Sequence, residues 1–147
     1  MTTVNATPLD DAIAARQRGN YAHALKIFKS LAAHGDAKAQ YNLGLMYENG
    51  QVVTRDYKEA VKLYRLAADQ GLAEAQYNLG VMYRYGYGVL QVRDYTSAHM
   101  WLNLASAGGS VLATEMRDKI TKEMTPQQIE KAQDMARECE ARNFTGC

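Results

Sequence analysis

Two copies of one pattern of about 36 residues dominate the sequence. Residues 37–71 and 73–109 carry the same residue types in the same order: Ala-Gln-Tyr-Asn-Leu-Gly, Met-Tyr, a glycine, Asp-Tyr, an alanine and a closing glycine. Within each half of the pattern, apolar residues recur at helical spacing. A repeat built from two helix-sized halves is typical of an α-solenoid, in which helix hairpins stack on one another. We therefore predict an all-α solenoid of antiparallel helix hairpins.

The flanking residues extend this pattern in both directions. Tyr21 and Gly35 fall where Tyr57 and Gly71 fall in the following repeat, so a degenerate repeat precedes the two clear copies. Thr-Pro dipeptides near both ends of the chain predict helix starts, because threonine is a favoured N-cap and proline is favoured at the first helical position. The predicted single domain comprises about three repeats (8–35, 36–71 and 72–109), a terminal capping helix pair (110–142) and a tail (143–147).

A glycine interrupts the first helix of each clear repeat. Gly44 and Gly80 occupy equivalent positions, although a glycine inside a helix costs about 1 kcal/mol relative to alanine. Its return at the same register predicts that another helix approaches closely there. We expect Ala60 and Ala98 to be the small residues opposite.

The charge pattern and hydropathy argue against several classes of partner. The sequence has 17 basic and 16 acidic residues, intermixed along its length, and a net charge of +1. It lacks the basic stripe that nucleic-acid binding requires, and no apolar run reaches the ~18 residues of a membrane-spanning helix. The first thirty residues contain no signal-peptide core. We expect no nucleic-acid partner, no membrane insertion, and either a cytosolic chain or one that lacks its export signal.

The repeated residues resemble the Sel-one-like repeat, a relative of the tetratricopeptide repeat. The family pattern is approximately A-x-A-Q-x-x-L-G-x-M-Y, a G-x-G-V loop, D-Y-x-x-A, an aromatic pair and A-A-x-x-G, and two copies match it nearly throughout. Val52 departs from it at a loop glycine that Gly88 retains. The resemblance implies a bacterial protein-interaction scaffold without a cofactor, which assembles or regulates other proteins. Because many short relatives are exported, it also favours the periplasm.

A stripe of residues on the first helices is the predicted binding site. In the tetratricopeptide fold that the repeats resemble, such positions line a concave groove that holds peptides, and Tyr and Arg are enriched at binding hot spots. The alternative is a solvated stripe whose tyrosines are wedged between neighbouring helices. The predicted partner-binding residues are Lys38, Tyr41, Leu45, Glu48, Glu74, Tyr77, Val81 and Arg84.

Two other function classes compete with the scaffold. Some cysteine-rich relatives have been linked to β-lactam binding, which suggests a weak hydrolase acting on β-lactams or cell-wall material. However, none of the four serines begins the S-x-x-K pattern of penicillin-recognising enzymes. His23, His34 and His99 lack the spacing of metal ligands, so we expect neither a catalytic nor a metal site. The remaining alternative is a structural spacer that binds along its edges or self-associates.

The two cysteines lie close together at the end of the sequence. Cys139 shares the apolar face of the last predicted helix, and Cys147 is the final residue. We expect the helix to end near Arg142 and Gly146 to let the tail reverse, so that Phe144 docks on the apolar face. The cysteines then either form a disulfide or remain two separate thiols, one buried and one in a frayed tail. A disulfide favours an oxidising compartment.

Overall fold

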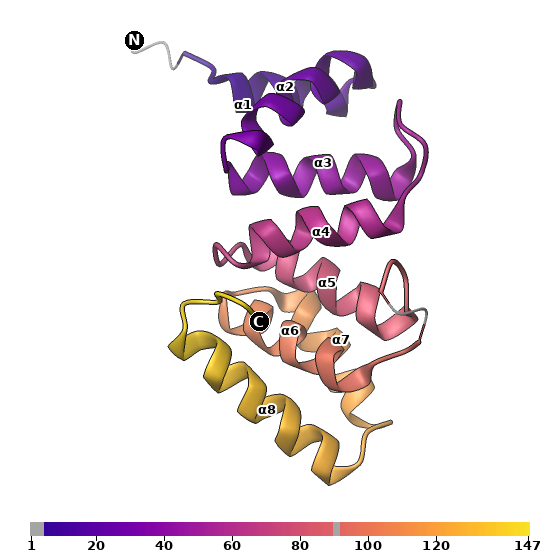
Figure 1. The fold of residues 1–147 in the computed structure, drawn as a ribbon, viewed down its shortest axis with the longest axis vertical. Helices are drawn as coiled ribbons and strands as arrows, with labels where there is room; N and C mark the ends of the chain where they lie inside the picture. The colour runs from indigo at the N-terminus through magenta and orange to yellow at the C-terminus, as the bar shows by residue number, and fades with distance from the viewer. Residues whose placement is uncertain (1–4, 90–91) are drawn as a thin grey trace.

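The structure, a computed structural model, describes residues 5–89 and 92–147. The described residues form helices joined by short connections, with no strand among them, and the predicted all-α solenoid is confirmed (Figure 1). None of the described helices is long and apolar enough to cross a membrane. The helices are α1 (Pro8–Gln17), α2 (Tyr21–Ala33), α3 (Ala37–Asn49), α4 (Tyr57–Ala68), α5 (Ala73–Tyr85), α6 (Tyr95–Ala107), α7 (Val111–Thr121) and α8 (Pro126–Ala141).

Side-chain caps fix where most of these helices begin. Thr7 and Thr125 each accept a hydrogen bond from a backbone amide of the first turn, and the side chains of Asp10 and Gln128 accept one from the cap backbone in return. These two capping boxes, each with proline at the first position, confirm the predicted starts. Carboxylate or hydroxyl oxygens cap four further helices; these N-cap residues are Asp36, Asp56, Asp94 and Ser110.

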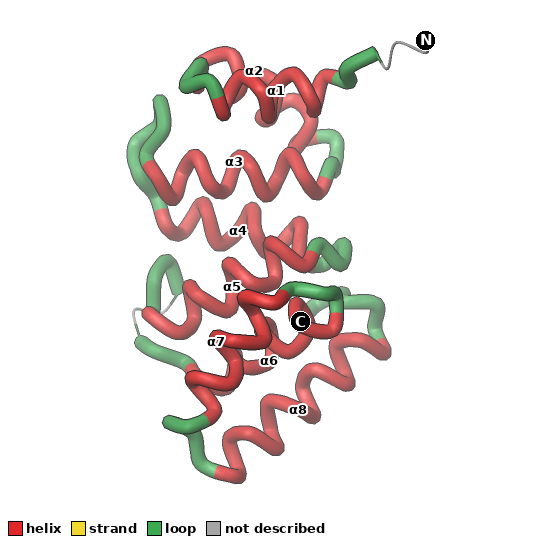
Figure 2. Tube along the Cα trace, turned by 180° about the vertical axis from the view of Figure 1, so that it is seen from behind, coloured by secondary structure: helices red, strands yellow, loops and turns green. Residues whose placement is uncertain are grey.

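The helices stack as hairpins along one direction (Figures 1 and 2). α3 pairs with α4, and α5 pairs with α6, while α2 and α4 each pack against the first helix of the following hairpin. The core is divided along the stack in the same way. Phe28 lies in the first apolar cluster, Tyr64 and Trp101 in the central one, and Leu102 and Ile120 in the last. Each hairpin therefore buries its apolar faces against its neighbours, as a solenoid does.

The repeated glycines lie at close helix contacts, but the residues opposite them differ from the sequence prediction. A Cβ atom at Gly44 would lie 2.6 Å from the Tyr64 ring, and one at Gly80 would lie 2.6 Å from Leu102 Cγ. The opposing side chains therefore come one turn later than the predicted Ala60 and Ala98, although the Ala98 carbonyl oxygen also lies opposite Gly80, 3.3 Å from such a Cβ atom. The glycines admit a large side chain into the contact, which is why small residues opposite are not required.

The terminal helix pair departs from the regular hairpin. α8 packs against α6 instead of α7 (Figure 1). In the aligned repeats, α7 carries Arg117 and Asp118 where α5 carries Leu79 and Gly80. With an arginine and an exposed aspartate at those positions, α7 lacks the apolar surface against which a hairpin partner would pack. The apolar face of α8 is instead buried on α6.

The C-terminal tail is bonded back to α8. Cys139 and Cys147 form a disulfide with a Cα–Cα distance of 5.6 Å, which settles the open alternative in favour of the bridge. The helix ends at Ala141 with Arg142 as C-cap, as expected. The reversal begins earlier than Gly146, since Asn143 and Phe144 already have positive φ. The amide of Phe144 donates to the Cys139 carbonyl at 2.9 Å, and its side chain packs against the central core cluster.

Val52 has a backbone conformation that disfavours a β-branched residue. Its φ of 61° is in the left-handed region, and Gly88, the equivalent residue of the next repeat, has a φ of 67°. The loop thus keeps the backbone shape of the family glycine while carrying a valine. A left-handed conformation costs an L-residue about 1–2 kcal/mol, and the 59% exposed side chain of Val52 gains little from burial in return.

We expect Val52→Gly to stabilise the protein. Relief of the backbone strain exceeds the extra conformational entropy that glycine loses on folding, about 0.5–1 kcal/mol, so the net gain is up to about 1 kcal/mol. For a domain of this size, the melting temperature should rise by about 2–4 °C. Val52→Ala, which keeps the left-handed penalty, is the control and should gain less. A melting temperature of Val52→Gly at or below the wild-type value would contradict the assigned strain.

Candidate functional site

The eight residues of the predicted site lie on α3 and α5, the first helices of two successive repeats. We call this set the first-helix face: Lys38, Tyr41, Leu45, Glu48, Glu74, Tyr77, Val81 and Arg84. Lys38 and Glu74 are exposed, and the other six residues are half-buried. Half-buried side chains on the first helices of successive repeats pack against their neighbours and still leave part of their surface open to a partner.

Tyr41 is the centre of the first group on this face. Its ring lies 5.9 Å from the ring of Tyr64, at an angle of 40°. Burial raises the pKa of Tyr41, and the negative charges of Glu74 and Glu48 raise it further, while Arg16 opposes them. Tyr41 therefore keeps its proton at neutral pH and remains a hydrogen-bond donor. The structure thus brings together three of the predicted residues: Tyr41, Glu48 and Glu74.

Tyr64, which the helical spacing of the second half of the repeat places on the core stripe of α4, completes this group. The side chain is fully buried, crosses Gly44 of α3, and its hydroxyl donates a hydrogen bond to Glu48 Oε2. Burial and this bond both raise the pKa of Tyr64 far above its ordinary value. The neutral phenol therefore holds the Glu48 carboxylate in one position on the first-helix face.

α1 contributes a cation to the same neighbourhood. Arg16 lies close enough to influence the Tyr41 phenol, and its Nε donates to Gln51 Oε1 at 3.1 Å. Arg16 could not be recognised as a site residue from the sequence, because the first repeat is degenerate and lacks the residues that define the stripe. With Arg16, the group offers a guanidinium, a phenol and two carboxylates drawn from three successive repeats.

Three of the remaining predicted residues, Tyr77, Val81 and Arg84, lie on α5, while Lys38 and Leu45 lie on α3. Tyr77 packs against the last core cluster. The guanidinium of Arg84 lies over the ring of Tyr85, 5.2 Å from its centroid, and its Nη1 is 2.7 Å from Met116 Sδ on α7. The first-helix face therefore has two halves, one around Tyr41 and one around Tyr77 and Arg84. Leu45, which packs against the central core, supports the first half.

The polar groups of the first-helix face can form hydrogen bonds and ion pairs. Within residues 5–89 and 92–147, no cluster of His, Cys, Asp and Glu could hold a metal ion. The described carboxylates, phenols and guanidiniums on the face can bind peptide groups and charged side chains through hydrogen bonds and ion pairs.

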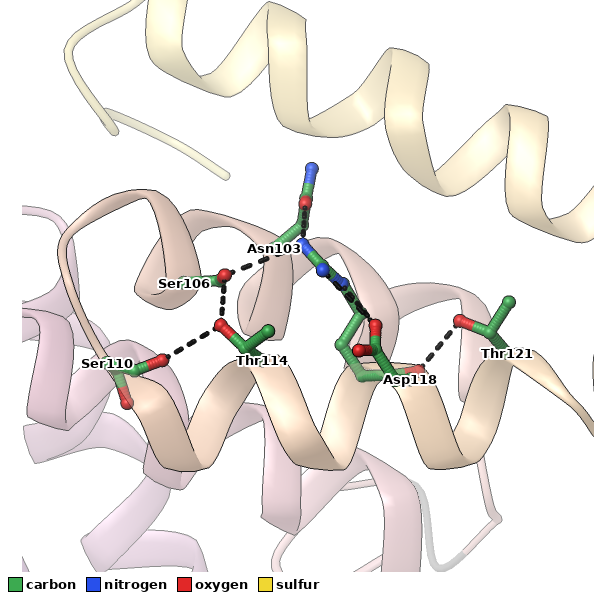
Figure 3. A network of polar contacts seen from close by, with 7 residues as sticks. Asn103, Ser106, Ser110, Thr114, Asp118 and Thr121 are labelled. Carbon is green, nitrogen blue, oxygen red and sulfur yellow. Dashed lines mark hydrogen bonds and ion pairs between the residues drawn. The ribbon is translucent and has the colours of Figure 1, made fainter.

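A second polar network joins α6 to α7 (Figure 3). Arg117 Nη1 donates to Asn103 Oδ1 at 2.9 Å, and its Nε and Nη2 both lie 3.2 Å from Asp118 Oδ1. The hydroxyls of Ser106 and Thr114 lie within hydrogen-bond distance of each other. This network occupies the side of α6 that faces α7; at the equivalent interface of the preceding repeat, Arg65 donates to the Tyr83 hydroxyl and Gln76 to the Ala68 carbonyl.

His99 is buried beside this network, and its Nδ1 has no hydrogen-bond partner among the residues that the structure describes. The residue is only 3% exposed. Burial lowers its pKa, the charge of Arg117 lowers it further, and Asp118 partly opposes them. A histidine with a depressed pKa binds fewer protons in the folded than in the unfolded state. Above the unfolded pKa of 6.5, this histidine is neutral in both states and does not oppose folding. As the pH falls from there towards the folded pKa, protonation favours the unfolded state, and the free energy of unfolding decreases.

We expect the free energy of unfolding to fall as the pH is lowered from about 7.5 to about 5, by about 1.4 kcal/mol for each pKa unit of depression. His99→Leu removes the titrating group and should show a smaller fall across the same range. Urea unfolding of both proteins at each pH measures the difference. Parallel pH dependence of the two proteins would contradict the assigned role of His99.

Comparisons with known proteins agree with this architecture. The Sel1 repeat family model matches residues 37–72 and 73–110, while no curated protein matches the chain. A protective antigen of uropathogenic Escherichia coli with an SLR fold is 30% identical, with a TM-score of 0.86 over 93% of this chain and 31% of its own. A Sel1 repeat protein from Oxalobacter formigenes has the same fold at 24% identity, with a TM-score of 0.73 over 88% of this chain and 55% of its own.

The chain thus spans about a third of the antigen and about half of the Oxalobacter protein. With half of its residues matched by the family model, and with a solved SLR fold that is 30% identical and covers 93% of it, the chain belongs to the Sel1 repeat family.

Proposed function

We propose that this protein is an interaction scaffold that binds a peptide or partner protein on its first-helix face. Sel1 repeats are generally protein–protein interaction modules and are typically non-enzymatic, which favours this function over a hydrolase. Stacked repeats offer extended surfaces for such binding. The observation that carries the proposal is the packing around Tyr41, whose ring lies 5.9 Å from that of Tyr64, the phenol that donates a hydrogen bond to Glu48 on the same face.

The arrangement supports binding because its polar groups are already held in place. Tyr64 fixes Glu48, and Gln51 fixes Arg16, before any partner arrives. Preorganised side chains lose less conformational entropy on binding than free ones. In this proposal Tyr41, Leu45, Tyr77 and Val81 provide the affinity, while Lys38, Glu48, Glu74 and Arg84 orient the partner.

We expect the double variant Tyr41→Ala/Tyr77→Ala to lose partner binding while keeping its helicity. Removal of two hot-spot tyrosines typically costs at least about 2 kcal/mol of binding free energy, or roughly thirtyfold in affinity. The immobilised chain and the variant are compared by quantitative pull-down from cells that produce the protein. Leu66→Ala, which alters an exposed residue of α4, is the matched control. Equal recovery of the partner by the double variant and the control would contradict the proposal.

A further inference from the structure

A continuous row of aromatic and cationic side chains lies at the loop ends of the second and third repeats. Tyr87 stacks with Tyr57 at 5.1 Å and with Tyr85 at 5.7 Å between ring centroids. Arg55 lies over Tyr57 at 5.3 Å, and Arg84 lies over Tyr85 at 5.2 Å. We call these five residues the tyrosine row. Apart from Arg84, they lie outside the first-helix face.

The row is exposed but held in place. Tyr85 and Tyr87 are 43% and 46% exposed. Tyr85 is the last residue of α5, and Tyr87 lies in the loop that follows. This loop comes so close to the start of α4 that a Cβ atom at Gly88 would lie 2.2 Å from the Tyr57 carbonyl oxygen. Gly86 and Gly88 both adopt the positive φ that this path requires. The backbone path of the loop is thus constrained, and stacking restricts the two exposed rings, which lowers the entropic cost of binding.

The electrostatics of the row select an acidic partner. Neither Arg55 nor Arg84 forms an ion pair with a carboxylate among the described residues, and Lys58 lies beside Arg55 at the adjoining cleft. The nearby Asp56 carboxylate accepts the amide of Glu59 as a helix cap. Because the ring faces are engaged along the row, the partner meets ring edges, which carry partial positive charge.

The exposed aromatic side chains of the row suit an extended segment. Proline-rich segments in the polyproline II conformation dock on surfaces lined by aromatic side chains. Because the rings of the row are stacked on one another, the prolines would pack against the exposed edges of Tyr85 and Tyr87. The chain does not supply this segment itself, because its two prolines, Pro8 and Pro126, both begin helices.

We propose that the tyrosine row binds an acidic, proline-rich segment of another protein in the polyproline II conformation. The arginines at the two ends pair with its carboxylates, and the tyrosine edges and hydroxyls contact its proline rings and backbone carbonyls. This surface is additional to the first-helix face, so one partner can engage both or two partners can bind separately.

The test uses synthetic peptides and isothermal titration calorimetry with the full chain. The probe is a peptide of three Glu-Pro-Pro repeats. Its controls are the matching Lys-Pro-Pro peptide, which reverses the charge, and the Glu-Gly-Gly peptide, which removes the polyproline II preference. We expect the probe to bind at least about tenfold more tightly than either control, which corresponds to about 1.4 kcal/mol.

Protein variants locate the site. Tyr85→Ala/Tyr87→Ala alters exposed rings only, and Arg55→Glu reverses one end charge; each should weaken probe binding at least about tenfold. Leu66→Ala and Tyr41→Ala/Tyr77→Ala should bind the probe as the wild type does, which separates this proposal from that of the first-helix face. No detectable binding of the probe, equal binding of the lysine peptide, unchanged binding by the row variants, or binding of oligothymidine in place of the peptide would overturn it.

Discussion

Gly80→Leu should destabilise the protein by about 1–3 kcal/mol, the usual cost of overpacking a close contact. A Cβ atom at this position already lies 2.6 Å from Leu102 Cγ and 3.3 Å from the Ala98 carbonyl oxygen, so α5 and α6 must separate to admit a larger side chain. The sign of the effect is informative. Helix propensity alone would make the same change stabilising by nearly 1 kcal/mol.

Thermal and urea unfolding measure this effect. The melting temperature of Gly80→Leu should fall by about 2–4 °C for each kcal/mol. Gln133→Leu, at an exposed position of α8, introduces the same side chain without a close contact and serves as the control. If the melting temperature of Gly80→Leu equals or exceeds that of this control, the α5–α6 contact is not as close as the structure shows.

Loss of the Cys139–Cys147 disulfide should lower the free energy of unfolding by about 2–3 kcal/mol. The bridged cysteines are 8 residues apart, and in the chain-entropy model a loop of this length is at the lower end of disulfide stabilisation. The bond also holds Phe144 in place, since a Cβ atom at Gly71 would lie 3.2 Å from its ring. Opening the bond therefore loosens a contact between the tail and the second repeat.

Three measurements together test the bond. Alkylation without reductant should modify no cysteine, and addition of reductant should lower the urea midpoint of the wild type. Cys147→Ser should match the reduced wild type and should not respond to reductant. Two alkyl groups added without reductant would show separate thiols and would remove the disulfide argument for an oxidising compartment.

The sequence predicted those features that depend on local patterns. Thr7-Pro8 and Thr125-Pro126 contain their own capping groups, so they fixed two helix starts without reference to the rest of the chain. The repeat period predicted the hairpins in the same way, because each repeat buries its apolar face against a copy of itself. The sequence also allowed a disulfide to be considered, because both cysteines belong to the end of one helix and the tail that follows it.

Features that depend on the distance between helices were not predicted. Tyr64 was assigned to the core from its periodicity, and only the close approach of α3 and α4 at Gly44 lets its hydroxyl reach Glu48. The position of α8 on α6 was not predicted either, because it depends on how α7, with Arg117 and Asp118 where α5 has Leu79 and Gly80, fits against its neighbours. The tyrosine row likewise depends on the path of the loop through Gly86 and Gly88.

Site-specific photocrosslinking tests the central claim, binding on the first-helix face, most directly. A photoreactive phenylalanine analogue is placed at position 77, on this face, or at position 66, on the exposed surface of α4. Irradiation in producing cells, followed by mass spectrometry, identifies any attached protein. We predict that a defined partner is crosslinked from position 77 and not from position 66. Crosslinking of a defined partner from position 66 alone would contradict the proposed binding face.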